Sequence, residues 1–302
     1  MTIPAEILER LSGLIALDLT FYRDVNIDLR GFSDEALYLH YFMHGYREGR
    51  PSSAQAMREG FLARLTPNRA LEIGPFCNPC LRGADVDYLD VFTTEELQQK
   101  ATALEFDAAG VPDIDYVSTD RTMRCVDKTY ELIFSSHNLE HQPDLIGHLC
   151  DVGDRLESGG RLALIVPNAR YCFDAALPLS SISDVFEAHA AGRDLHTLTS
   201  IINTRALSVH NDAAQHWREA GTLPFRPTDP ARVAEALTFY DNNRDNYNDV
   251  HAWRFDPLAL ADILNCLIAL DRIPFGRLVC NGPVRDRLEF TLTLHRDARP
   301  EA

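Results

Sequence analysis

The sequence predicts an α/β protein built on a mostly parallel β-sheet. Short apolar runs alternate with helical segments between residues 69 and 166, which is typical of parallel strands with helices on both faces. Two final apolar runs, 277–281 and 287–294, flank a turn and predict an antiparallel hairpin. Residues 178–250 have little strand pattern and predict an inserted helical cap.

Residues 1–52 predict a helical element in front of this sheet. Ser33 is a favourable N-cap because its hydroxyl can accept from the first turn, and apolar residues follow it at helical spacing. Gly45 and Gly49 are expected to stop the helix. We therefore place a domain boundary near residue 52, with residues 53–302 as the main domain.

Five apolar runs predict the parallel strands, and each is short and bounded by turn residues. A helix is expected over 144–156, and an amphipathic helix over 257–270 precedes the hairpin. The expected strands are 69–73, 86–90, 114–117, 130–134 and 161–166.

The composition is that of a globular protein with a core of normal size. The chain has 302 residues, of which 45% are hydrophobic, and a formal net charge of −16. Such an acidic chain repels phosphate backbones and anionic lipid, so we expect no nucleic-acid partner and no binding to a membrane surface. No apolar run approaches the roughly 20 residues that span a bilayer, so we also expect no membrane insertion. The seven Cys residues form no evident disulfide framework, which favours a reducing, cytoplasmic location.

Acidic residues lie at or just after the ends of the first three predicted strands. Glu72 and Gly74 end the first strand, where a tight turn lets a ligand approach the backbone. Asp90 ends the second strand, a position suited to accept both ribose hydroxyls of a nucleoside, and Asp120 follows the third. The dinucleotide fingerprint G-x-G-x-x-G is absent, and each Asp also fits the simpler role of a helix N-cap.

Two strings later in the chain are more specific. Residues 135–141 read SSHNLEH, and residues 156–167 read LESGGRLALIVP, with Ser158 where Pro is usual. Together they resemble the class I S-adenosylmethionine-dependent methyltransferases. The continuation over 167–174 and the pair Asn78–Pro79 resemble the subgroup associated with polysaccharide and O-antigen synthesis.

This resemblance implies a Rossmann-like sheet of seven strands, S-adenosylmethionine as cofactor, and a set of cofactor-binding residues. Glu72 and Gly74 would lie by the methionine end, Asp90 by the ribose and Asp120 by the adenine. The full implied set is Glu72, Gly74, Pro75, Asp90, Asp120, Arg121, Ser136 and His137.

Residues 21–50 carry a second resemblance, to a helical segment of bacterial glycosyltransferases and cell-surface glycan proteins. The string HYFMHGYREGR over 40–50 contributes most to it. It implies a context of glycan assembly, with residues 1–50 contacting a glycan-synthesis partner or a second copy of the chain.

Methyl transfer to a hydroxyl benefits from a general base, and His has a suitable pKa. We expect His137 first by position, with His210 and His251 from the cap as alternatives. Aromatic side chains beside amides and acids suit a sugar acceptor, although core packing would also explain them. The expected acceptor-binding residues are Arg170, Tyr171, His210, Asn211, His251 and Trp253.

His137, Glu140 and His141 formally match the H-x-x-E-H string of inverted zinc proteases, but they follow a strand of a nucleotide-type fold. Some methyltransferases with Glu-x-x-Glu-His at this place bind a divalent ion, so a metal stays open, with His210 or His251 as a further ligand. We assign no metal ligand from the sequence. Cys77 and Cys80 form a lone C-x-x-C, which lacks the four ligands of a structural zinc site.

The function predicted from the sequence is S-adenosylmethionine-dependent methyl transfer to an oxygen of a glycan, sugar or nucleotide-sugar. Two alternatives remain open. One is N- or C-methylation of a small metabolite. The other is a non-catalytic scaffold with a methyltransferase fold that binds a glycosyltransferase.

Overall fold

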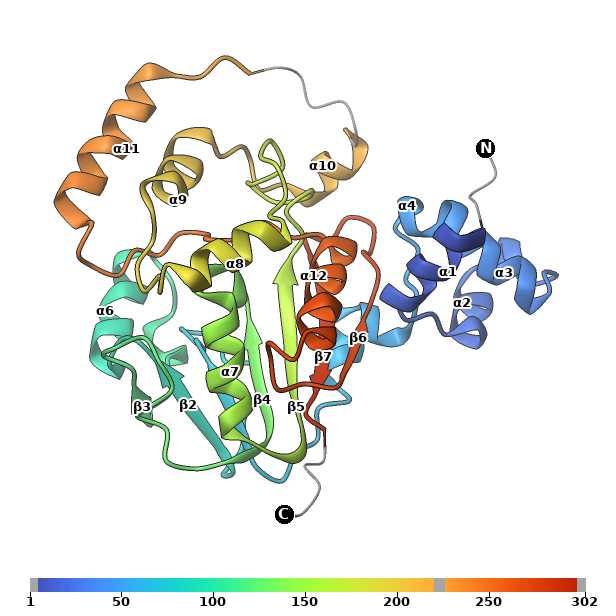
Figure 1. Ribbon diagram of the computed structural model, residues 1–302, viewed down its shortest axis with the longest axis horizontal. Helices are drawn as coiled ribbons and strands as arrows, with labels where there is room; N and C mark the ends of the chain where they lie inside the picture. The colour runs from blue at the N-terminus through green and yellow to red at the C-terminus, as the bar shows by residue number, and fades with distance from the viewer. Residues whose placement is uncertain (1–4, 220–225, 298–302) are drawn as a thin grey trace.

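The computed structural model describes residues 5–219 and 226–297, which form one sheet of seven strands and the helices around it (Figure 1). The strand order is β3-β2-β1-β4-β5-β7-β6. The first five strands of the chain pair in parallel, and β7 is antiparallel to both β5 and β6. The strands are β1 (Ala70–Ile73), β2 (Val86–Asp90), β3 (Tyr116–Val117), β4 (Tyr130–Ser136), β5 (Leu156–Pro167), β6 (Arg277–Cys280) and β7 (Glu289–His295).

This order is that of the Rossmann-like methyltransferase fold, so the predicted fold class is confirmed. The strand order reverses between β1 and β4, and in open α/β sheets ligands bind beyond the carboxyl ends of the strands at such a point. The β1 strand is buried along its whole length, as expected for a central parallel strand covered on both faces.

The edge strand β3 is shorter than the run 114–117 predicts. Only two residues pair with β2. Just before them, the side chain of Asp115 accepts a hydrogen bond from the Tyr88 amide at 2.8 Å, in place of a backbone carbonyl. A side chain that takes the place of a backbone acceptor in this way shortens the strand, while β2 and the residue before β3 stay hydrogen-bonded.

Helices cover both faces of the sheet. Leu149 of α7 and Leu264 of α12 pack against the face that contains Ile133 of β4, whereas Phe61 of α5 packs against the opposite face, with Leu132. Figure 1 shows α7 and α12 crossing in front of the sheet. The helices and turns of this part are η3 (Ala54–Ala56), α5 (Arg58–Leu62), α6 (Thr94–Ala103), η4 (Ala108–Gly110), η5 (Leu139–His141), α7 (Leu145–Arg155) and α12 (Pro257–Ala269).

The predicted insertion is helical and lies beyond the carboxyl end of β5 (Figure 1). It has a small apolar core of its own, which includes Ile201, Ala236 and Val250. Its first helix is tied to α7, because the ring of His189 lies 2.8 Å from the carboxylate of Asp144. The insertion contains α8 (Ile182–Ala190), α9 (Leu198–Ile202), η6 (Asn203–Leu207), α10 (Ala213–Arg218) and α11 (Pro230–Asn243).

The N-terminal element is helical and lies beside the β6 edge of the sheet (Figure 1). Backbone hydrogen bonds dock it there: the Ala16 amide donates to the Cys280 carbonyl at 2.7 Å, and the Arg285 amide donates to the Gly49 carbonyl at 2.8 Å. The element contains α1 (Ala5–Leu14), α2 (Leu19–Val25), η1 (Ile27–Leu29), α3 (Asp34–His40), η2 (Tyr41–Gly45) and α4 (Tyr46–Glu48). None of the helices in the described part of the chain is long and apolar enough to cross a membrane.

The prediction that Gly45 stops the helix is wrong. Helical structure runs on through the π-helical turn η2 into α4 and ends at Gly49, which adopts a left-handed φ of 69°. Gly45 is instead needed for packing, because a Cβ atom there would overlap the hydroxyl of Tyr22.

We therefore expect Gly45→Ala to destabilise the protein, although Ala is favoured over Gly in helices by about 1 kcal/mol. Gly13→Ala is the matched control, since nothing lies within 4 Å of a Cβ atom at that helical position. Urea denaturation should show a lower free energy of unfolding for Gly45→Ala and an unchanged or higher one for Gly13→Ala. Equal effects of the two substitutions would contradict the packing role.

Candidate active site

A cavity of about 600 Å³ lies at the carboxyl ends of β1, β2 and β4. Gly74 and Pro75, which follow β1, line it as predicted. Gly74 has a φ of 69°, and a Cβ atom there would lie 2.8 Å from the side-chain nitrogen of Asn138. The backbone therefore turns at the cavity wall in a way that only glycine adopts without strain.

Glu72 holds the loop that follows β1. Its carboxylate oxygens accept hydrogen bonds from the amides of Cys80 and Leu81 at 2.9 and 2.8 Å. Burial raises the pKa of Glu72 to about 6, and these two hydrogen bonds oppose that rise. Glu72 lines the cavity, but each of its carboxylate oxygens already accepts a hydrogen bond from the loop.

Asp90 lies at the carboxyl end of β2 and lines the cavity, as predicted. Its carboxylate accepts from the Phe92 amide at 3.1 Å. Burial raises the pKa of Asp90 to about 6, although nearby backbone amides and Lys100 act in the opposite direction. Lys100 also forms an ion pair of 2.7 Å with Asp249 from the end of the cap. Its positive charge therefore stabilises the ionised forms of both Asp90 and Asp249.

Asp120 does not line the cavity. Its carboxylate is used locally, because it accepts from both the amide and the hydroxyl of Thr122 and lies 3.7 Å from Arg124. The structure therefore does not support contact between Asp120 and adenine. The cavity wall at this place is made by its neighbours Ser118, Arg121, Thr122 and Met123, of which Arg121 was predicted.

The tip of β4 presents a polar network to the cavity. The His137 Nε2 atom lies 2.8 Å from a carboxylate oxygen of Glu289 on β7. The guanidinium of Arg58 donates to the same oxygen at 3.0 Å and to the Ser136 hydroxyl at 3.2 Å. Burial acts to raise the pKa of Glu289, but His137 and Arg58 outweigh it and lower that pKa.

Sequence reasoning missed Arg58 and Glu289, and equally Lys100, Tyr247 and Asp249, all of which line the cavity or contact its lining residues. Arg58, Lys100 and Glu289 belong to no motif, whereas Tyr247 and Asp249 lie just before His251, which was predicted. They come from segments far apart in the chain that only the folded sheet and cap bring together.

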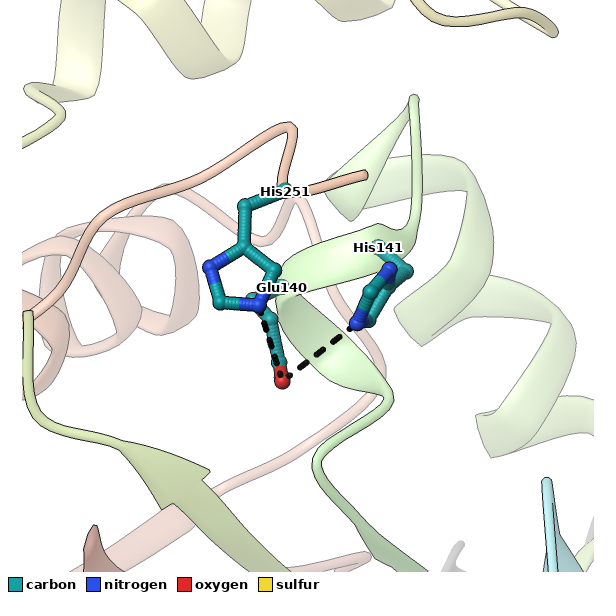
Figure 2. A group of neighbouring side chains, drawn as sticks. All are labelled: Glu140, His141 and His251. Carbon is teal, nitrogen blue, oxygen red and sulfur yellow. Dashed lines mark ion pairs between the residues drawn. The ribbon is translucent and has the colours of Figure 1, made fainter. Parts of the chain in front are cut away.

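The end of the cap reaches the cavity through a backbone contact. The carbonyl oxygen of Glu140 accepts from the amides of Ala252 and Trp253 at 2.7 and 3.1 Å. This contact places His251 next to Glu140 and His141, and all three side chains line the cavity. Figure 2 shows one carboxylate oxygen of Glu140 lying between the two imidazole rings.

Arg170 and Tyr171 were expected to touch the acceptor, but neither lines the cavity. Arg170 forms an ion pair with Asp256 at 2.6 Å, which anchors it at the start of α12. Tyr171 stacks on Trp217 with ring centroids 3.9 Å apart. Both side chains have structural partners that direct them away from the predicted role.

His210, Asn211 and Trp253 also lie outside the cavity lining. His210 stacks on His216 at 3.9 Å, and the Asn211 side chain accepts from the Phe173 amide at 3.1 Å. Asn211 therefore supports Phe173, which does line the cavity. Trp253 is 1% exposed and belongs to the main core.

Cys77 and Cys80 are free thiols in the loop that Glu72 holds. Burial raises the pKa of Cys80, with the charge of Glu72 adding to the effect. A raised pKa disfavours the reactive thiolate, which agrees with an ordinary thiol at Cys80.

We expect Trp253→Phe to act on stability and not on ligand binding. The indole N–H of Trp253 donates to the Gln142 carbonyl at 2.6 Å, so the substitution leaves that carbonyl unpaired and a small void. Chemical denaturation monitored by circular dichroism should show a loss of about 2 kcal/mol. Weaker acceptor binding at unchanged stability would restore the acceptor-binding role.

No protein-family model and no curated protein matches the sequence. The chain is similar to solved structures at low identity. An S-adenosylmethionine-dependent methyltransferase from Mesorhizobium loti is 16% identical, with 81% of this chain and 98% of that chain covered and a TM-score of 0.33. A possible histamine N-methyltransferase from Thermotoga maritima is 11% identical, with 91% and 97% covered and a TM-score of 0.38.

For other neighbours the match is partial. The CcbJ methyltransferase from Streptomyces caelestis is 19% identical, with 42% of this chain and 53% of that chain covered and a TM-score of 0.28. The chain thus spans about half the length of that protein. At these identities and TM-scores, the fold assignment depends on the strand order and pairing described above.

Proposed function

We propose that the protein transfers a methyl group from S-adenosylmethionine to an acceptor bound under the helical cap. One observation carries the proposal: the methyltransferase-type sheet has its cavity where the strand order reverses, with Gly74 after β1 and Asp90 at the end of β2. The sequence strings that resemble methyltransferase motifs lie next to this cavity: residues 135–141 are the end of β4 and the turn after it, and residues 156–167 are the neighbouring strand β5, which ends at the same edge.

The cavity residues fit this cofactor chemically. When bound, S-adenosylmethionine supplies an electrophilic methyl group on a sulfonium. Asp90 offers a carboxylate to two ribose hydroxyls, and the turn at Gly74 leaves the backbone accessible. Ser118, Arg121 and Met123 form a mixed polar and apolar wall beyond Asp90 that suits a purine ring.

For the acceptor we propose an oxygen of a glycan, sugar or nucleotide-sugar. The support is the resemblance of residues 167–174 and 21–50 to proteins of glycan synthesis. The cap side of the cavity adds aromatic and polar groups from Phe173, Tyr247 and His251, which suit ring stacking and directional hydrogen bonds. The same groups would also accommodate an amine acceptor, so N-methylation is the outcome to test against.

His137 is the side chain we propose as general base. The Glu289 carboxylate can only accept, so the Nε2 atom of His137 donates to it at 2.8 Å, and Nδ1 is the ring atom that would take the proton of the acceptor. Arg58 donates to the same oxygen of Glu289, so Arg58 positions Glu289 and Glu289 in turn orients the imidazole of His137. His137 has a left-handed φ of 53°, a costly conformation of the kind found at functional sites.

The proposal predicts that Asp90→Ala weakens binding of both S-adenosylmethionine and S-adenosylhomocysteine. Loss of hydrogen bonds to a charged acceptor corresponds to about 10- to 100-fold in affinity. Isothermal titration calorimetry measures it, with Asp113→Ala as the control because Asp113 is exposed and lies outside the cavity. Absence of binding to the unmodified protein at millimolar ligand would favour the scaffold alternative.

Cofactor affinity should also depend on pH through Asp90. Because burial raises the pKa of Asp90 to about 6, the side chain is ionised above that pH and accepts from hydroxyls, and it is protonated below it. Affinity should therefore fall as the pH drops from about 7 to about 5. The Asp90→Asn side chain cannot titrate, so this variant should bind the cofactor more weakly at pH 7, and its affinity should vary less with pH.

Since burial also raises the pKa of Glu72 to about 6, the comparison of the unmodified protein with Asp90→Asn isolates the contribution of Asp90. Parallel pH profiles would assign the dependence to another group.

A further inference from the structure

We infer that Glu140, His141 and His251 form a binding site for one divalent first-row metal ion at the wall of the cavity. A carboxylate and two imidazoles are a ligand set used for Zn²⁺, Mn²⁺, Fe²⁺ and Co²⁺. The ligand atoms of the three side chains lie within 4.8 Å of one another. They converge from two segments, the η5 turn after β4 and the chain that leaves the cap (Figure 2).

The first argument is the state of Glu140. Its side chain is 2% exposed, and neither carboxylate oxygen has a hydrogen-bond partner among the described residues. An ionised carboxylate that is buried without hydrogen-bond donors is strongly unfavourable, and a positive charge placed next to it removes that cost. A bound cation supplies that charge and occupies the free oxygens.

The second argument is distance. The Nε2 atoms of His141 and His251 each lie 3.7 Å from the same Oε1 atom of Glu140. That separation is too long for a hydrogen bond. Two ligands that share a tetrahedral ion at about 2.1 Å lie about 3.4 Å apart, so small side-chain rotations would close the site.

The third argument is the support behind the two histidines. His251 Nδ1 lies 2.6 Å from the buried carboxylate of Asp174, and His141 Nδ1 lies 3.2 Å from Asp249. The hydrogen bond between His251 Nδ1 and Asp174 favours the tautomer with a proton on Nδ1 and directs the lone pair of Nε2 toward the ion, which is the usual arrangement behind histidines that bind metals. His141 Nδ1 faces Asp249 without a hydrogen bond among the described residues, so the carboxylate supports that ring by its charge alone.

A protonated His251 is the competing explanation for the charge beside Glu140. It would account for one imidazole, but it leaves Glu140 without a hydrogen bond and gives no reason for the second imidazole at the same distance from the same oxygen. The metal accounts for all three side chains together.

All three side chains line the cavity, so an ion held by them would keep coordination positions open toward it. Resting on the proposed function, we assign these positions to oxygen atoms of the acceptor. Coordination would fix a hydroxyl in place and lower its pKa, which eases removal of its proton. An acceptor with two neighbouring hydroxyls, as in a sugar, would gain most.

The test is binding of Co²⁺ to the full chain after removal of metals with a chelator, in the absence of cofactor and acceptor. We expect one Co²⁺ per chain, seen in the visible absorption spectrum. Glu140→Gln and His251→Gln should each weaken binding at least about 10-fold, and Asp174→Asn about 10- to 100-fold. His44→Gln, which removes an exposed imidazole of the N-terminal element, is the control and should bind normally.

A second measurement needs no variant and covers the case in which the variants fail to fold. The proton NMR spectrum of the Co²⁺-loaded protein should show two solvent-exchangeable, paramagnetically shifted resonances, one from the Nδ1–H of each histidine. No stoichiometric Co²⁺ binding, unchanged affinity in folded Glu140→Gln, or an absence of these two resonances would each overturn the inference.

The two proposals can fail separately. Co²⁺ binding without any binding of S-adenosylmethionine would leave the metal site standing and remove the methyltransferase assignment. Binding of S-adenosylmethionine that is unaffected by chelator, together with no Co²⁺ binding, would do the reverse.

Discussion

The carbonyl oxygen of Glu140 is the point on which the site depends. It accepts two backbone hydrogen bonds, from Ala252 and Trp253, and so joins the turn after β4 to the chain that returns from the cap. Other contacts also hold the cap, among them those of His189 with Asp144 and of Asp249 with Lys100. The backbone contact at Glu140 places the last segment of the cap at the wall of the cavity, where His251 and Asp249 lie beside the residues after β4. The side chain of Trp253 also joins these two segments, because its indole N–H donates to the Gln142 carbonyl and its ring packs in the main core.

The cavity wall contains carboxylates that are costly to bury. Burial raises the pKa of both Glu72 and Asp90 to about 6, against the effect of the amides that donate to them. Groups perturbed in this way gather at functional sites, where local stability is given up for chemistry. The positive charges that oppose these pKa rises come from separate segments: Arg58 acts on Glu72, and Lys100 acts on Asp90. Each of these cations also forms an ion pair with a second carboxylate, Arg58 with Glu289 and Lys100 with Asp249.

The N-terminal element reaches the site indirectly. Its docking to β6 and to the loop before β7 positions the segment that leads into α5. The Thr291 hydroxyl of β7 donates to the Gln55 carbonyl at 2.7 Å, three residues before Arg58. Arg58 then connects this segment to Glu289 and, through it, to His137. A helical element that lies beside the sheet thus orients a side chain in the cavity.

The sequence by itself determined that a sheet forms, that its parallel strands come first in the chain and an antiparallel hairpin last, and which residues end the strands. Alternating apolar runs and Gly/Pro boundaries are local signals, and a side chain at the end of a parallel strand lies at the carboxyl edge whatever the loops do. For that reason Gly74, Asp90, Ser136 and His137 were expected at that edge, and all four line the cavity there. Only the tertiary structure decided which side chains of the cap face the cavity. His251 faces it, whereas His210 and Trp253 do not, because the direction of a loop side chain depends on long-range contacts such as that of Glu140 with residues 252 and 253. The tertiary structure also decided the place of Asp120, whose carboxylate accepts hydrogen bonds from Thr122 in the same turn and does not face the cavity. Arg58 and Glu289 are distant in sequence and form their ion pair only in the folded protein.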